Sequence, residues 1–138
     1  MKERLALVVA ALWWGSLTTL GFLVVPMLFA HLPTPAQAGG MAARLFAAQT
    51  GVSVGCGLLL LMIFGPKKTF PSVKGSFNAI GLIAFSMLLS LLVEFGVSPR
   101  IVARENLSFW HSVGSAMYFL QWICTGLLLW RLTARQAP

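Results

Sequence analysis

The fold is decided by the stretch Asn78-Ala-Ile-Gly-Leu-Ile-Ala-Phe-Ser86-Met-Leu-Leu-Ser90-Leu-Leu-Val-Glu94-Phe-Gly-Val-Ser98. This stretch is long and apolar enough to cross a bilayer as an α-helix. Ser86, Ser90 and Glu94 recur at every fourth position, so a helix places their side chains in one polar stripe. A carboxylate at mid-bilayer costs roughly 2.5–3.5 kcal/mol on insertion scales. We therefore predict that the stripe faces other helices or water rather than lipid.

The composition of the whole chain indicates an integral membrane protein. Of its 138 residues, 58% are hydrophobic and only 9% are charged, and the mean hydropathy is +0.85. A soluble domain has about a quarter of its residues charged, so too few charges remain here to cover a soluble surface. We predict one membrane domain over residues 1–138, with the lipid bilayer as its partner.

The net charge of +7 would suggest nucleic acid as the partner of a soluble protein. Here the cations lie in short segments between apolar runs, where they set the topology and contact anionic headgroups. The basic residues are not interleaved with exposed aromatic residues, so we expect no nucleic-acid binding.

Four apolar segments predict four membrane-spanning helices, and connectors rich in proline, glycine and charge separate them. The predicted fold class is an all-α, up-down four-helix bundle. Pro26 predicts a kink in the first helix. Pro99 predicts the end of the third helix, because the residue before a proline avoids the helical region. The approximate helix ranges are 5–31, 41–64, 78–98 and 109–130.

The distribution of cations predicts the orientation of the bundle. An even number of spans puts both termini on one side of the membrane, and that side collects seven lysines and arginines against three on the other. The positive-inside rule then places both termini in the cytoplasm. The seven are Lys2, Arg4, Lys67, Lys68, Lys74, Arg131 and Arg135, and the three are Arg44, Arg100 and Arg104.

The opposite, outward side collects the ionisable residues that lie within or beside the apolar segments. Glu94, Arg44, His31 and His111, with Gln49, form a candidate ligand-binding pocket for a small ligand or cation. Two interpretations of Glu94 stay open. It is either a proton or cation site, or the partner of an arginine in an ion pair that ties the third helix to its neighbours.

The two histidines suggest an alternative. The first and last helices of an up-down bundle are neighbours, so His31 and His111 could bind haem iron, or join Met27 around copper. They could equally bond headgroups, water or Glu94. The dense histidine set of a dihaem cytochrome is missing, so we predict no cofactor, and a haem- or copper-linked redox protein remains an alternative. No sequence motif of a catalytic nucleophile, a metalloprotease or a phosphate-binding loop supports an enzyme.

Gly51-Val-Ser-Val-Gly55 is a GxxxG motif, in which small residues let a neighbouring helix approach closely. We expect Gly51 and Gly55 to mediate helix packing within the chain, with a homodimer face as the alternative. A charged outer rim together with such a face would also suit an accessory or scaffolding subunit of a larger membrane complex.

Three segments carry a resemblance to a known family. They are Gly21-Phe-Leu-Val-Val-Pro26-Met-Leu-Phe29-Ala-His31-Leu-Pro33, the following Ala38-Gly39 with Ala43 and Leu45-Phe46, and Trp110-His111-Ser112-Val-Gly114. These residues look like those of the transmembrane protein 205-like domain, the bacterial family called domain of unknown function 4149. The resemblance covers most of the chain. It implies a small four-helix protein of the bacterial inner membrane whose activity is undetermined.

Overall fold

The computed structural model describes residues 1–65 and 73–134, with side-chain positions for 1–65 and 79–134. Within these ranges every regular element is helical, as the sequence predicted. Four of the helical rods are long and apolar enough to span a membrane. Lys67, Lys68, Arg135 and the side chain of Lys74 lie outside the described part, so the cation count on their side rests on sequence alone.

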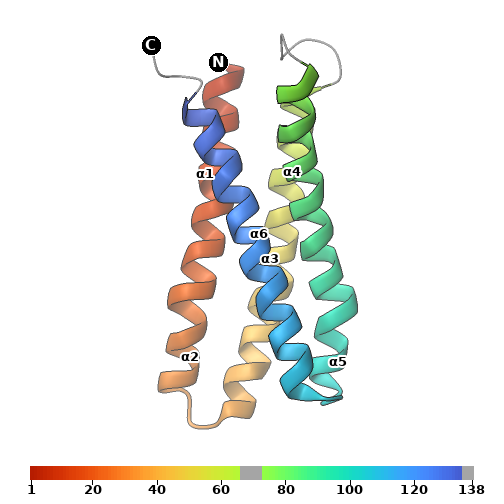
Figure 1. The fold of residues 1–138 in the computed structure, drawn as a ribbon. Coiled ribbons are helices and arrows are strands. Elements are labelled where there is room, and N and C mark those ends of the chain that lie inside the picture. Colours follow the sequence, from red (N-terminus) through yellow and green to blue (C-terminus); the bar gives the residue numbers. More distant parts are fainter. Residues whose placement is uncertain (66–72, 135–138) are drawn as a thin grey trace.

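Each rod is one continuous helix or a series of helical elements without a break (Figure 1). The first rod consists of α1, η1 and α2, the second of α3, the third of α4, η2 and α5, and the fourth of α6. Here η denotes a π-helical turn, in which the backbone bonds skip one residue more than in an α-helix. The elements are α1 (Lys2–Thr19), η1 (Leu20–Val24), α2 (Val25–His31), α3 (Pro35–Phe64), α4 (Val73–Leu92), η2 (Val93–Val97), α5 (Ser98–Val102) and α6 (Leu107–Ala134).

The rods are longer than the sequence predicted. The second begins at Pro35 rather than near residue 41, because proline fits the first turn of a helix and Thr34 caps it. The Thr34 hydroxyl accepts a hydrogen bond from the Gln37 backbone N–H at 3.3 Å. The prediction that the third rod ends at Pro99 is wrong, since α5 continues to Val102.

A π-helical turn precedes each of the two membrane prolines. Pro26 and Pro99 both stand two residues after the turn, at the start of α2 and of α5. A proline lacks the N–H and its ring crowds the carbonyl four residues earlier. In each turn a backbone N–H donates a hydrogen bond to the carbonyl five residues earlier, from Val25 N–H to Leu20 O and from Ser98 N–H to Val93 O. The wider turn accommodates the prolines without ending either rod.

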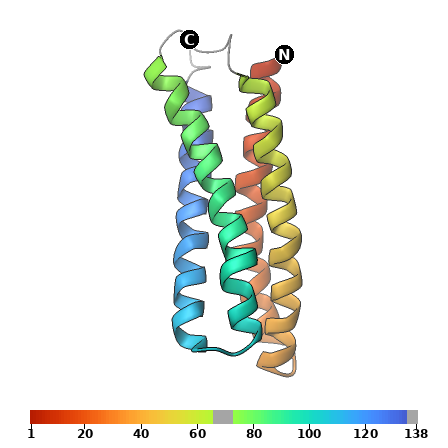
Figure 2. The same cartoon turned by 90° about the vertical axis from the view of Figure 1, so that its right-hand side faces the viewer.

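The packing of the rods forms a closed ring. α1 packs against α3 and α6, and α4 packs against the same two helices. Figures 1 and 2 show that the first residues of α1 and the last of α6 lie at one end of the bundle, and that the connectors after α2 and after α5 lie at the other. We call these the terminal end and the connector end.

The hydrophobic core occupies the half of the bundle near the terminal end. Small and branched side chains from all four rods meet there, so this half is packed and apolar. Its buried members are Ala6, Val9, Ala10, Trp13, Leu17, Leu60, Phe64, Ala79, Ile83, Leu128 and Leu132. The buried hydrophilic side chains begin at the edge of this core and extend towards the connector end.

Candidate functional site

The centre of the bundle holds a hydrogen-bonded cluster from three rods. The hydroxyl oxygen of Ser53, on α3, accepts hydrogen bonds from Trp13 Nε1 and from Gln121 Nε2, each at 3.0 Å. Trp13 and Ser53 are fully buried, and Gln121 is 2% exposed. Polar groups in a membrane bundle must find partners inside the protein, and these three residues supply one another.

A second set of bonds ties α1 to its neighbours beside this cluster. Gln49 Nε2 donates to Ser16 Oγ at 2.9 Å, and Trp122 Nε1 donates to Thr18 Oγ1 at 2.8 Å. Since Ser16 and Thr18 themselves donate to carbonyls of α1, their lone pairs are left to accept from the other helices. The centre is thus organised by amides and indoles that donate to hydroxyl oxygens.

A small cavity lies between α3, the junction of α4 with η2, and α6, and has a volume of about 10 Å³. Such a volume admits one water molecule and excludes any organic ligand. Its lining is mixed but uncharged, and comprises Phe46, Gln49, Thr50, Ser53, Ser90, Val93, Tyr118 and Gln121. Gln49 is the one residue of the predicted pocket that lines it.

Glu94 lies in η2, immediately after Val93 and one turn after Ser90, both of which line the cavity. Its Oε2 atom is buried and has no hydrogen-bond partner within the described residues. Ser86 Oγ, two turns earlier, is likewise buried and unpartnered there, whereas Ser90 Oγ donates to Met87 O at 2.7 Å. Ser86 and Ser90 are 1% and 3% exposed, so this part of the stripe faces the other helices.

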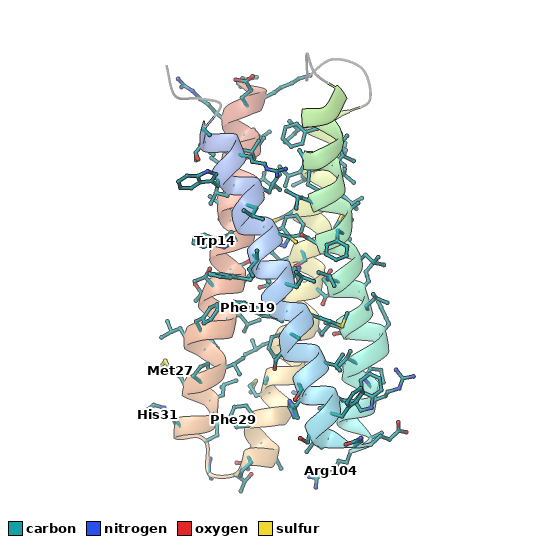
Figure 3. The ribbon with its side chains drawn as sticks, in the orientation of Figure 1. Trp14, Met27, Phe29, His31, Arg104 and Phe119 are labelled. Carbon is teal, nitrogen blue, oxygen red and sulfur yellow. The ribbon has the colours of Figure 1, made fainter. Side chains whose placement is uncertain are left out.

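The other residues of the predicted pocket lie on the outside of the bundle. His31, Arg44 and His111 are all exposed. Figure 3 shows His31 and Met27 on the outer side of α2, pointing away from the other helices, and His31 Nδ1 donates to the Met27 carbonyl at 3.0 Å. Only Glu94 and Gln49 of the five predicted pocket residues have side chains turned into the bundle.

The arginines at the connector end are engaged elsewhere. Arg100 donates to the Gly96 carbonyl at 2.9 Å, and its guanidinium lies 4.5 Å from the centre of the Trp110 ring. Arg104 is exposed in the connector before α6, with a φ of 57°. Within the described part of the chain Glu94 forms no ion pair with either arginine or with Arg44.

Metal-binding side chains do not converge in the described residues. No three histidine, cysteine, aspartate or glutamate side chains there form a group that could hold a metal ion. Cys56 and Cys124 are free thiols on different rods. The prediction that no cofactor binds is untested, and haem or copper binding by His31, His111 and Met27 stays the alternative that the sequence left open.

The GxxxG glycines do not pack as expected. Gly51 and Gly55 are exposed on the outer face of α3, and no atom lies within 4 Å of a Cβ built at either one. Gly57 makes the close contact instead, since a Cβ there would overlap the side chain of Met87 on α4. Gly21, in η1, also makes a close contact, with the ring of Tyr118. For packing within the chain, the motif spacing therefore pointed to the wrong glycines, and a homodimer face is left as the alternative.

The sequence analysis also missed the central cluster of Trp13, Ser53 and Gln121. A signal was present, because Gln49 and Gln121 are side-chain amides inside apolar segments, and an amide in such a segment requires a partner. The depth at which Ser53 meets Gln121 depends on how α3 and α6 are aligned, which periodicity does not reveal.

The rods and their buried hydrophilic centre define an all-helical membrane protein with four candidate spans. The chain belongs to the family described as "Domain of unknown function (DUF4149)", whose model matches residues 8–109. This confirms the family expected from the sequence, while the likeness to transmembrane protein 205 remains a resemblance. Searches of curated proteins and of solved structures returned no match.

Proposed function

We propose that this chain is a polytopic protein of the bacterial inner membrane that binds a small cation, the proton included, at Glu94. The observation that carries the proposal is the buried Oε2 atom, which has no partner in the described residues. Glu94 as a whole is half-buried, but a buried carboxylate oxygen without a partner is unfavourable in an apolar bundle. A bound cation or proton would remove this unfavourable term, so the residue suits binding better than stability.

The site is entered from the connector end in this proposal. Both termini lie in the cytoplasm by the distribution of lysines and arginines, so the connector end faces outward. The exposed residues His31, Arg44 and His111 then surround the entrance rather than the binding centre. They would tune the local concentration of ions, which is a long-range electrostatic effect.

Binding, rather than passage across the membrane, is favoured by the distribution of polar side chains. The half of the bundle near the terminal end is packed with apolar residues such as Leu60, Ile83 and Leu128. The described core residues of that half offer an ion no hydrogen-bonding groups to follow. The described helices therefore support a site that opens to one side only.

The proposal is tested with Glu94→Gln and the matched control Glu105→Gln, whose carboxylate is exposed in the connector before α6. Thermal unfolding of the purified full chain in detergent is followed across a pH series and with added Na⁺, K⁺ or Mg²⁺. A cation that binds the folded state raises the midpoint by mass action. We expect the parent and Glu105→Gln to respond and Glu94→Gln not to respond. An identical response of all three would refute the proposal.

A second candidate function is favoured by one observation, the open outer face of α3. Gly51 and Gly55 are exposed there with no neighbouring atom in the described structure. Small residues on a lipid-facing surface permit close helix association, and we take a second copy of the chain as the occupant. An accessory role in a larger complex would use the same face.

The dimer candidate is tested with Gly55→Leu against Gly15→Leu, because neither glycine has an atom within 4 Å of its Cβ position. Cross-linking in native membranes should give a dimer for the parent and for Gly15→Leu, and a monomer for Gly55→Leu. A parent that remains monomeric across a range of protein-to-lipid ratios excludes the dimer.

A further inference from the structure

We propose that the cavity beside η2 binds a single water molecule, and that the cation exchanged at Glu94 is accordingly the proton rather than a metal ion. This inference rests on the proposed function and adds the identity of the cation. It follows from which hydrogen-bonding groups of the lining residues are already engaged.

Most hydroxyl groups of the lining donate a hydrogen bond to a backbone carbonyl. Thr50 Oγ1 donates to Phe46 O, Ser90 Oγ donates to Met87 O, and Tyr118 Oη donates to Leu17 O. The Nε2 groups of the two lining glutamines donate to serine oxygens. The lone pairs of these hydroxyls and the Oε1 atoms of the glutamines therefore remain, and the cavity is rich in hydrogen-bond acceptors.

Donors remain beside these acceptors, namely the second N–H of each glutamine Nε2 and the Ser53 hydroxyl. Ser53 Oγ already accepts from Trp13 and from Gln121, and its own O–H has no acceptor among the described residues. If the Gln121 amide is turned over, Ser53 donates to its oxygen and the amide N–H₂ becomes the free donor. In either orientation the lining presents both donors and acceptors, which a water molecule can satisfy, whereas a metal cation cannot accept a hydrogen bond.

The charge and the size of the cavity favour water as well. Its eight lining residues are uncharged, and its volume is about 10 Å³. One water molecule requires about 10–15 Å³ and two to four polar partners. A metal ion would have to leave its hydration shell without a carboxylate in the lining, which is far more costly than burying a neutral molecule.

The water and Ser90 extend the central cluster towards Glu94. Ser90 lines the cavity and lies one turn before Glu94, in the polar stripe of the third rod. On protonation, a proton from the solution at the connector end forms one O–H bond with the carboxylate, whose charge rises from −1 to zero. No electron moves.

The titratable groups on the surrounding helices do not pair with Glu94. η2 packs against α3, α4, α5 and α6. The exposed cations of these helices lie outside the bundle, the Tyr118 hydroxyl is bonded to Leu17 O, and the two thiols are uncharged. The groups are Arg44 and Cys56 on α3, Arg100 on α5, and His111, Tyr118, Cys124 and Arg131 on α6; the side chain of Lys74 on α4 lies outside the described residues.

The test is an infrared difference spectrum of the purified full chain, acid minus neutral, recorded in ordinary water and in water enriched in oxygen-18. The chain has only three acidic side chains, so Glu94→Gln assigns the carboxyl band directly. We expect a Glu94-dependent carboxyl band that is unaffected by Na⁺ or K⁺, together with an O–H band that shifts with oxygen-18. Ser53→Ala should abolish the shifted band, and Ser112→Ala, on the exposed face of α6, should retain it.

Ser90→Ala is the second variant, should Ser53→Ala fail to fold, and it should weaken the same band. A Glu94 band that responds to Na⁺ or K⁺ at constant pH would identify a metal cation, which overturns the water inference and leaves the proposed function standing. A proton-dependent Glu94 band without any oxygen-18 shift overturns the inference in the same way. If no Glu94-dependent band responds to pH or to ions, both the inference and the proposed function fail.

Discussion

Tyr118 donates a hydrogen bond from its hydroxyl group to the backbone carbonyl of Leu17 at 2.7 Å, across 101 positions of the sequence. The bond reaches α1 three residues before the π-helical turn η1 begins, and the ring of Tyr118 lies against Gly21 inside that turn. A helix that changes its bonding pattern leaves backbone groups in need of other partners. α6 therefore stabilises the irregular part of the first rod.

Replacement of Tyr118 by phenylalanine should test this bond alone. The variant retains the ring against Gly21 and loses the donor to Leu17 O, so we expect the free energy of unfolding to fall by about 0.6–1.5 kcal/mol. Unfolding by titration with a denaturing detergent measures the change. Ser112→Ala, which removes an exposed hydroxyl bonded within α6, is the control, and an equal effect in the two variants would contradict the role of Tyr118.

Gly21→Ala should be more harmful than any alanine placed on the outer face of α3. A Cβ at Gly21 would lie 2.6 Å from Tyr118 Cε1, so the ring must move. We expect a loss of about 1–3 kcal/mol in stability, as for other overpacked sites. Gly55→Ala meets no atom within 4 Å and should be neutral or stabilise the helix by up to about 1 kcal/mol. Equal stabilities would show that the close contact is absent.

Ser53→Ala should destabilise the bundle because it leaves two buried donors, Trp13 Nε1 and Gln121 Nε2, without their acceptor. The expected loss is about 1–3 kcal/mol. The tryptophan fluorescence should change as well, since the indole N–H of Trp13 loses its bond. A double variant with Gln121→Leu should be less unstable than the sum of the two single changes, because the residues share one network. Strict additivity would indicate that they act independently.

Glu94→Met should stabilise the protein while abolishing its response to cations. The substitution replaces a buried, unpartnered carboxylate oxygen by an apolar side chain of similar length. We expect a gain of about 1 kcal/mol or more in the free energy of unfolding. Destabilisation would mean that Glu94 has a structural partner and was retained for stability.

The orientation is tested with single cysteines at Glu3 and at Ala103, in a background where Cys56 and Cys124 are replaced by alanine. Glu3 lies at the terminal end and Ala103 in the connector before α6, and both are exposed. In intact cells a membrane-impermeant maleimide should label Ala103→Cys, and Glu3→Cys only after permeabilisation. The reverse pattern would invert the proposed topology.

The sequence allowed prediction of the helices because length and hydrophobicity alone determine a membrane span. It also identified the stripe of Ser86 and Ser90, which are buried, because a regular spacing of polar side chains is visible in one segment. The boundaries were less accurate at Pro35 and Pro99, where proline fits the first turn of a helix instead of ending one.

The positions of the histidines could not be predicted in the same way. Both faces of these helices are apolar, since the lipid-facing side chains are as hydrophobic as those in the core, so the sequence contains no amphipathic signal for His31 or His111. The π-helical turns change the register within two rods. The pairing of Ser53 with Gln121 depends on the relative depth of two helices, which a single sequence does not encode.

The apolar half of the bundle has an electrical consequence. A membrane voltage falls mainly across the regions of lowest dielectric constant, and the packed segment around Leu60 and Ile83 is such a region. A charge arriving at Glu94 from the connector end would traverse only the other half, and so only part of the potential difference. Protonation of Glu94 should therefore depend strongly on the pH of the adjoining compartment and only weakly on the membrane potential.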